Sequence, residues 1–169
     1  MLCSVLITGH APWGQWNVYR QEHLLILSTR EDIPSYPFSK ILVSVLNQKL
    51  PESSARPARA RTFDRVQSLF STGQIPLLVL SKKNAVDLTS GMGVFSKYNP
   101  IPARIICMFD DLVLISVADF PPKFAWLVTN AIINSKDIIQ DANLNLEEDF
   151  PIPIHLGSEA YILGKPIPE

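Results

Sequence analysis

The 169-residue sequence is poor in the residues that build disulfide frameworks and metal centres. It has two cysteines, Cys3 and Cys107, too few for such a framework, and two buried thiols are favoured over a single bridge. Its three histidines, His10, His23 and His155, lie far apart and lack the spacing of metal ligands. We therefore expect no metal centre and no cofactor.

Sequence motifs of common enzymes and binding proteins are missing too. The chain contains no Walker loop, no GxGxxG, no CxxC pair, no HExxH and no GxSxG. Its net charge is -1, which argues against a nucleic-acid partner. No apolar run approaches the ~20 residues that span a bilayer. The first nine residues lack the basic region of a signal peptide. Three explanations remain open: the protein is cytoplasmic, a signal peptide has been removed from it, or its true start lies upstream.

Hydrophobic residues make up 47% of the chain, and its length suits one domain with a real core. The stretch that organises the rest runs from His23 to Leu46. Leu24 to Leu27 are consecutive apolar residues, typical of a strand covered on both faces. A polar turn from Ser28 to Asp32 follows, and apolar residues then recur at helical spacing. That helical face comprises Phe38, Ile41, Leu42, Val45 and Leu46.

A connector and a short helix come next. Residues 55–61 alternate small and basic side chains, and Pro57 confines this segment to the edge of a sheet. Thr62 is placed to cap a helix that Gly73 stops. Residues 75–80 then predict a second buried strand, followed by a turn over residues 81–85. Residues 84–89 predict one or two helical turns, which Gly91 ends.

The second half predicts a hairpin, a helix and a wrapping tail. Residues 104–109 and 112–117 are apolar runs separated by Asp110 and Asp111, which we interpret as a turn rather than an acid–base pair. A helix begins near Pro121 or Pro122 and runs to Ile133. We divide the chain into an arm over 1–21, a lobe over 22–161 and a tail over 162–169. The arm is expected to pack through Trp13, Trp16 and Tyr19, and residues 147–149 are expected to form a solvated acidic face.

Polar side chains follow the predicted strands, where the carboxyl ends of parallel strands meet at one edge of a sheet. Helix N-terminal amides at such an edge can hold an anion. The four arginines between 56 and 65 either capture that anion or form a solvated surface. We expect His23 and His155 to be structural. The candidate ligand-binding residues are Ser28, Thr29, Ser35, Tyr36, Arg61, Thr62, Ser81 and Asn84.

The order of these elements resembles the TAXI family, the solute receptors of TRAP-type transporters, which have the type II periplasmic-binding-protein fold. The similarity extends over roughly residues 22 to 161 as an ordered series of motifs. The matching stretches are Leu24–Thr29 with Ser35–Pro37, Arg61–Gln74, Ile75–Ser81 with Asn84–Ala85, Leu112–Ile115 with Asp119–Pro121, and Pro151–Tyr161. Arg30, Glu31 and Asp32 stand where the family has glycines.

The family has two lobes that close over a ligand, with the second inserted into the first. Here about twenty residues separate Gly91 from the returning strand, too few for an inserted lobe. The resemblance therefore implies a single lobe: a three-layer α/β fold with a mixed, mostly parallel sheet flanked by helices. The strands at 24–27 and 75–80 would be central and parallel, and the strand at 112–117 antiparallel to them.

The resemblance implies a non-enzymatic receptor-like module that binds a small polar or carboxylate solute. In the site, Tyr36 would cover the solute and Arg61 would pair with its carboxylate. The implied location is periplasmic and the implied partner is a membrane transporter subunit, with a homodimer replacing the missing lobe. The alternatives are a ligand-free interaction or scaffold domain and, less favoured, an enzyme built on such a lobe.

Overall fold

The computed structural model describes residues 20–144 and 150–169. The predictions for the N-terminal arm, including its aromatic residues, Cys3 and His10, lie outside the described residues, apart from its last two positions. The acidic stretch at 147–149 also lies outside them.

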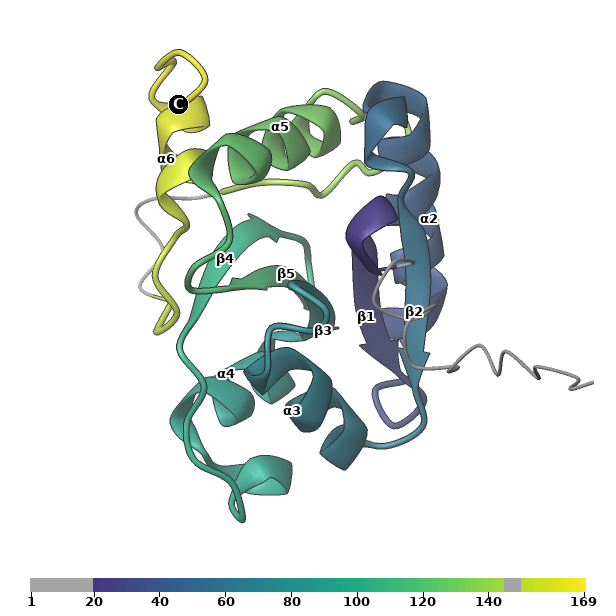
Figure 1. The fold of residues 1–169 in the computed structure, drawn as a ribbon, viewed down its shortest axis with the longest axis vertical. Coiled ribbons are helices and arrows are strands. Elements are labelled where there is room, and N and C mark those ends of the chain that lie inside the picture. Colours follow the sequence, from purple (N-terminus) through teal and green to yellow (C-terminus); the bar gives the residue numbers. More distant parts are fainter. Residues whose placement is uncertain (1–19, 145–149) are drawn as a thin grey trace, which may run out of the picture.

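The described chain forms a five-stranded mixed sheet in the order β2-β1-β3-β5-β4 (Figure 1). β1 is parallel to both of its neighbours, whereas β5 is antiparallel to β3 and β4. The predicted α/β class is confirmed, as are the two interior parallel strands and the antiparallel strand of the hairpin. The strands are β1 (Leu25–Thr29), β2 (Arg56–Ala60), β3 (Leu77–Ser81), β4 (Ala103–Met108) and β5 (Leu112–Val117).

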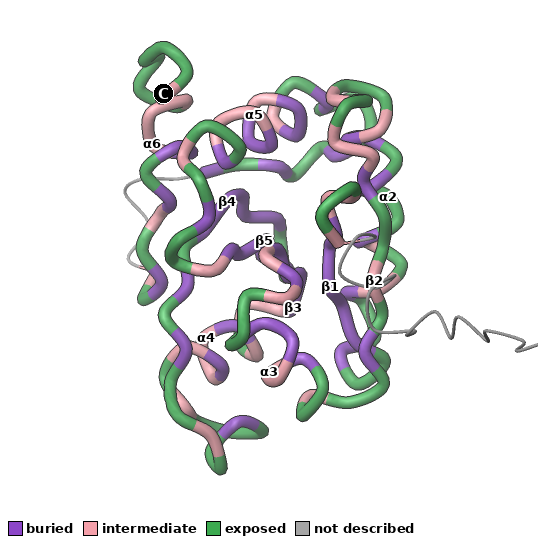
Figure 2. The backbone as a smooth tube through the Cα atoms, in the orientation of Figure 1, coloured by how far each residue is buried: buried purple, intermediate pink, exposed green. Residues whose placement is uncertain are grey.

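Helices cover both faces of this sheet (Figure 1). Residues in β1 and β3 alternate between the two cores, so that Ile26 packs with α2 and α5 while Leu27 packs with α3 and α4. Figure 2 shows the central strands buried along their length. The helices are α2 (Ser35–Lys49), α3 (Phe63–Ser71), α4 (Lys82–Ser90), α5 (Pro122–Ile133) and α6 (Leu156–Ile162), with short 3-10 turns η1 (Pro51–Ser53) and η2 (Gly93–Phe95).

Both edges of the sheet are protected. β2 is the edge strand that its proline predicted, and the Arg56 amide donates to the Leu24 carbonyl at 3.0 Å. Because hydrogen bonds alternate along a strand, Pro57, which has no N–H, faces outward. At the other edge the Ile105 amide donates to the Pro153 carbonyl, and the His155 amide donates to the Ile105 carbonyl, both at 2.9 Å.

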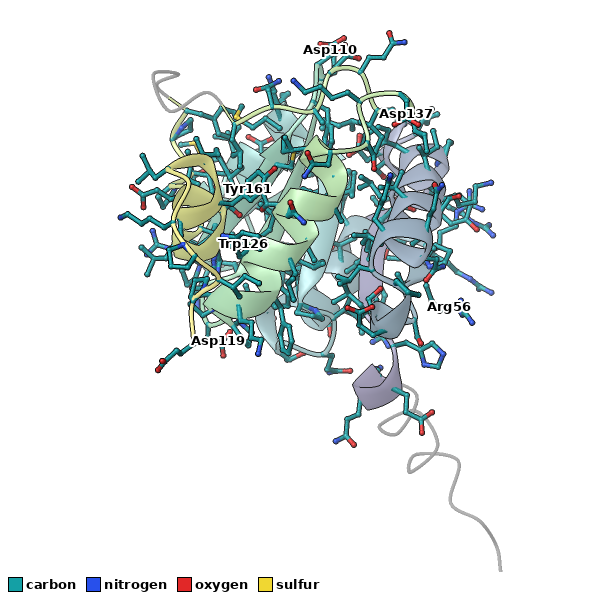
Figure 3. All side chains as sticks on the ribbon, turned by 90° about the horizontal axis from the view of Figure 1, so that it is seen from above. Arg56, Asp110, Asp119, Trp126, Asp137 and Tyr161 are labelled. Carbon is teal, nitrogen blue, oxygen red and sulfur yellow. The ribbon has the colours of Figure 1, made fainter. Side chains whose placement is uncertain are left out.

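Residues 153–155 lie along β4, and the chain then forms a helix where the sequence predicted only a segment that wraps the surface. This helix, α6, packs against α5, where the Trp126 and Tyr161 rings meet edge to face with centroids 5.2 Å apart (Figure 3). Thr129 Oγ1 donates to Ser158 Oγ at 2.7 Å in the buried contact between the two helices. The backbones approach closely because Gly157 has no side chain.

Replacing Gly157 with alanine should therefore destabilise the fold. The added Cβ would collide with the Pro122 carbonyl and lie 2.9 Å from the Trp126 amide nitrogen, so α6 would have to move. We expect Gly157→Ala to lower the free energy of unfolding by about 1–3 kcal/mol in urea titrations. Glu159→Ala, on the same helix, should cost less than about 1 kcal/mol. Equal stability of the glycine variant and the wild type would contradict the close packing.

Candidate functional site

Three strands and three helices meet at the carboxyl edge of the parallel strands. β1, β2 and β3 end at Thr29, Ala60 and Ser81, and α2, α3 and α4 begin just beyond these residues. The predicted site residues are therefore brought to one edge of the sheet, in two different environments.

Ser28, Thr29 and Ser35 are fully buried and hydrogen-bonded within the protein. The Ser28 hydroxyl lies 3.3 Å from that of Ser39 and donates to the Ala58 carbonyl at 3.2 Å. Ser35 Oγ donates to the Asp32 carbonyl at 2.8 Å and accepts from the Thr29 amide at 3.3 Å. These hydroxyls join the β1–α2 loop to its surroundings, and a solute does not reach them in this structure.

Tyr36 and Asn84 also differ from their expected placement. The Arg59 guanidinium lies 4.1 Å from the centroid of the Tyr36 ring, so an arginine of this chain covers the ring. The helical turns predicted over residues 84–89 are confirmed as part of α4, but the turn predicted over residues 81–85 was wrong, because α4 begins at Lys82 directly after β3. No glycine or proline separates strand from helix there, and Ser81, in extended conformation, precedes the first helical turn. Asn84 is therefore part of α4.

Two carboxylates of the β1–α2 loop occupy the amides at this edge. Glu31 Oε2 accepts from the Phe63 amide at the start of α3 at 2.5 Å. Asp32 Oδ2 accepts from the Ser81 amide at 2.6 Å, and Asp32 is buried. The amides at this edge that were expected to hold a solute anion therefore bind side chains of the protein itself.

An open groove of about 990 Å³ lies beside this edge, on the α3 side of β1 and β2. Arg61 and Thr62, both exposed, line it, whereas the six other predicted site residues do not. We call it the arginine groove, because four arginines and no acidic residue line it. The lining residues are Arg20, Leu25, Leu27, Pro57, Ala58, Arg59, Ala60, Arg61, Thr62, Arg65, Leu69 and Ile75.

The arginines of this groove differ in their own contacts. Arg20 Nη1 donates to Gln74 Oε1 at 2.5 Å, and Arg59 covers Tyr36. Arg61 and Arg65 form no ion pair with any described acidic residue. The neighbouring Asp64 pairs with Lys97 at 2.9 Å, and the hydrogen bond from Lys97 lowers the pKa of Asp64. Two guanidinium groups are thus available to a ligand.

A second cavity, of about 480 Å³, lies at the amino ends of β1 and β3, between the end of α2 and the start of α5. Sequence reasoning missed it, because its residues come from segments far apart in the chain and share no motif. Phe124, with 52% of its surface exposed, is the one residue whose position in the helical pattern could have indicated this cavity.

Cys107 and His155 are the described side chains whose chemistry is best suited to catalysis, and both are held by contacts within the fold. Burial raises the pKa of the Cys107 thiol to about 12, so it is not a thiolate near neutral pH. His155 Nδ1 accepts from the Gly157 amide at 3.1 Å, and Nε2 lies 2.8 Å from the Phe120 carbonyl oxygen. Burial lowers the pKa of His155, the contact with the Phe120 carbonyl raises it, and the positive charge of Arg104 lowers it. One neutral tautomer satisfies both contacts, whereas a proton on Nδ1 breaks the helix cap.

Comparison with known proteins does not assign the chain to a family. No model of a known protein family matches the chain, and no curated protein matches it in sequence. The resemblance to the TAXI family therefore stays a prediction. No helix of the described residues is long and apolar enough to cross a membrane. Within the same residues no group of three metal-ligating side chains is placed to hold a metal ion.

Removing the Asp32 carboxylate should destabilise the protein. The Ser81 amide would lose its acceptor in a partly buried place, which costs about 1–3 kcal/mol. We expect this loss for Asp32→Ala in urea titrations, with partial recovery in Asp32→Asn, which keeps an acceptor oxygen. Glu31→Ala removes a more exposed bond and should cost less than about 1 kcal/mol. If Asp32→Ala costs no more than Glu31→Ala, the buried bond is not important to the fold.

The stability of the protein should fall as the pH is lowered through the ordinary range of histidine. Because the pKa of His155 is lower in the folded state, the unfolded state binds more protons between the two pKa values. Stability therefore rises with pH there, by at most about 1.4 kcal/mol per pH unit for one proton. In His155→Asn, which keeps a capping oxygen but does not titrate, the slope of unfolding free energy between pH 5 and pH 7 should be shallower. Parallel slopes for the two proteins would exclude His155 as the titrating group.

Proposed function

We propose that this chain is a non-enzymatic binding module of the solute-receptor type, whose ligand is a carboxylate with an apolar body. The ligand lies in the arginine groove, with its carboxylate on Arg61 and Arg65 and its apolar part against Pro57 and Ala58. The observation that supports this most is the lining of the groove: four arginines beside an apolar floor, with no acidic residue.

The magnitudes require both parts of the ligand. An exposed arginine–carboxylate pair contributes only about 0.2–1 kcal/mol, so two such pairs alone do not hold a small anion. Burial of hydrocarbon adds about 25 cal/mol per Å² removed from water, and Pro57 and Ala58, which are not buried, offer such area in the groove. A small polar anion without an apolar part would therefore bind weakly.

The fold is consistent with a single receptor-type lobe. β5 returns antiparallel beside β3, as the resemblance implies for the strand that follows the inserted lobe, and a short turn at Asp110 and Asp111 joins it directly to β4. On this proposal a second copy facing the groove replaces the missing lobe. A periplasmic location and a membrane transporter subunit as partner belong to the same proposal.

Native mass spectrometry of protein purified without added ligand tests this proposal first, followed by calorimetric titration with octanoate and acetate. We expect octanoate to bind and acetate not to, because acetate lacks the apolar body. Arg61→Ala and Arg65→Ala should each weaken octanoate binding up to about fivefold, which corresponds to about 1 kcal/mol. Arg56→Ala is the matched control, since Arg56 lies on β2 outside the groove lining (Figure 3).

Failure of octanoate to bind, or equal effects of Arg61→Ala and Arg56→Ala, would contradict the proposal. Loss of octanoate binding at high salt would support the ionic part, since exposed ion pairs are screened.

A ligand-free interaction domain is the second candidate, and one observation favours it. Leu156, the first residue of α6, and Leu163, the residue just after its end, are 70% and 51% exposed. Large apolar side chains left in water are typical of a docking surface. The same mass spectra separate the two candidates: a ligand-free dimer favours the interaction domain, whereas a bound small molecule favours the receptor.

A further inference from the structure

The second cavity differs from the arginine groove in shape, lining and charge. It lies at the opposite end of the sheet from the carboxyl edge, and Figure 3 shows this difference in position through Asp119, which lines the cavity, and Asp110, which follows β4 at the carboxyl edge. Its volume of about 480 Å³ is within the range of small-molecule sites. We call it the amino-edge pocket.

The wall of the amino-edge pocket is apolar and partly aromatic. Phe120 and Phe124 both line it, with ring centroids 6.4 Å apart. Phe120 is buried, whereas Phe124 leaves 52% of its surface in water. Leu24, Leu50 and Leu127 complete the wall. A half-exposed phenylalanine beside a cavity offers a ring face that a ligand can cover.

Charges at this pocket are mostly negative. Glu22, Glu52 and Asp119 line it and are exposed. Arg20 also lines it, but its guanidinium donates to Gln74. Three carboxylates against one guanidinium leave the lining with an excess of negative charge, the reverse of the arginine groove.

A polar group without a partner also lies in the lining. The hydroxyl oxygen of Ser53 is buried and has no hydrogen-bond partner among the described residues. A buried hydroxyl without a partner costs free energy, and a ligand that supplies a donor recovers it.

We propose that the amino-edge pocket binds a small organic cation, an ammonium ion attached to an aromatic or aliphatic body. The body packs against Phe120, Phe124 and Leu127. The ammonium group lies between the carboxylates of the rim, donates to Ser53 Oγ and contacts the exposed face of Phe124. This site differs from the proposed carboxylate groove in the charge of the ligand that it selects, although Arg20 lines both cavities.

Titration with phenethylamine tests the proposal, with phenethyl alcohol as the neutral analogue and hydrocinnamate as the anionic one. We expect saturable binding of the amine, weaker binding of the alcohol, and no shift by hydrocinnamate at this pocket. In amide NMR spectra the amine should shift the resonances of Phe124, Leu127 and Val128, while those of Arg61 and Thr62 stay in place.

Variants of exposed residues keep the fold intact and locate the site. Phe124→Ala should weaken phenethylamine binding about tenfold. Glu52→Gln should weaken it up to about fivefold. Ile33→Ala, which changes an exposed residue outside the pocket, should leave it unchanged. Ser53→Ala should weaken binding of the amine while leaving the free protein as stable as the wild type or more so.

Three results would overturn the proposal: no binding of the amine to the folded wild type, equal binding to the wild type and to Phe124→Ala, or hydrocinnamate shifting the same resonances as strongly. Arg61→Ala, which weakens the arginine groove, should not change phenethylamine binding. A failure of one site is thereby distinguished from a failure of the other.

Discussion

The hydrogen bond from the Ser81 amide to the Asp32 carboxylate connects the two central strands of the sheet through side chain as well as backbone. Asp32 belongs to the loop after β1, and Ser81 ends β3, so this bond fixes how the first α/β unit meets the second. The Ser35 hydroxyl stabilises the same loop by donating a hydrogen bond to the Asp32 carbonyl. Because the Asp32 carboxylate is bonded to the Ser81 amide, it is not available to a ligand.

The pattern of apolar residues, together with the residues that end strands and helices, was enough to predict most of the architecture. The continuous apolar runs identified β1 and β3 as interior strands, Pro57 identified β2 as an edge, and the Asp110–Asp111 pair identified the hairpin. Each of these features depends on backbone chemistry within a few residues. α6 was missed because seven residues with a glycine and little apolar periodicity give no helical signal, and its stability comes from packing on α5.

The candidate site was predicted at the correct edge but not with the correct accessibility. Ser28 and Thr29 were expected to follow the first strand but are its last two residues, and Ser35 begins α2. A sequence does not show whether hydroxyls at such positions face solvent or a neighbouring helix. The substitution of Glu31 and Asp32 for glycines was visible in the sequence. Its consequence, two occupied amides, required the distances of 2.5 and 2.6 Å that only the folded chain provides.

The two protected sheet edges bear on how this protein behaves at high concentration. Amyloid-like growth and strand exchange require a row of free amides on an outer strand. β2 presents Pro57 outward, and the backbone of β4 is bonded to the tail at Pro153 and His155. Copies of this chain therefore cannot add to one another readily through their sheets. Any stable assembly must be built from side chains on helices or in grooves. Point mutations of those side chains can therefore change the assembly without disturbing the sheet.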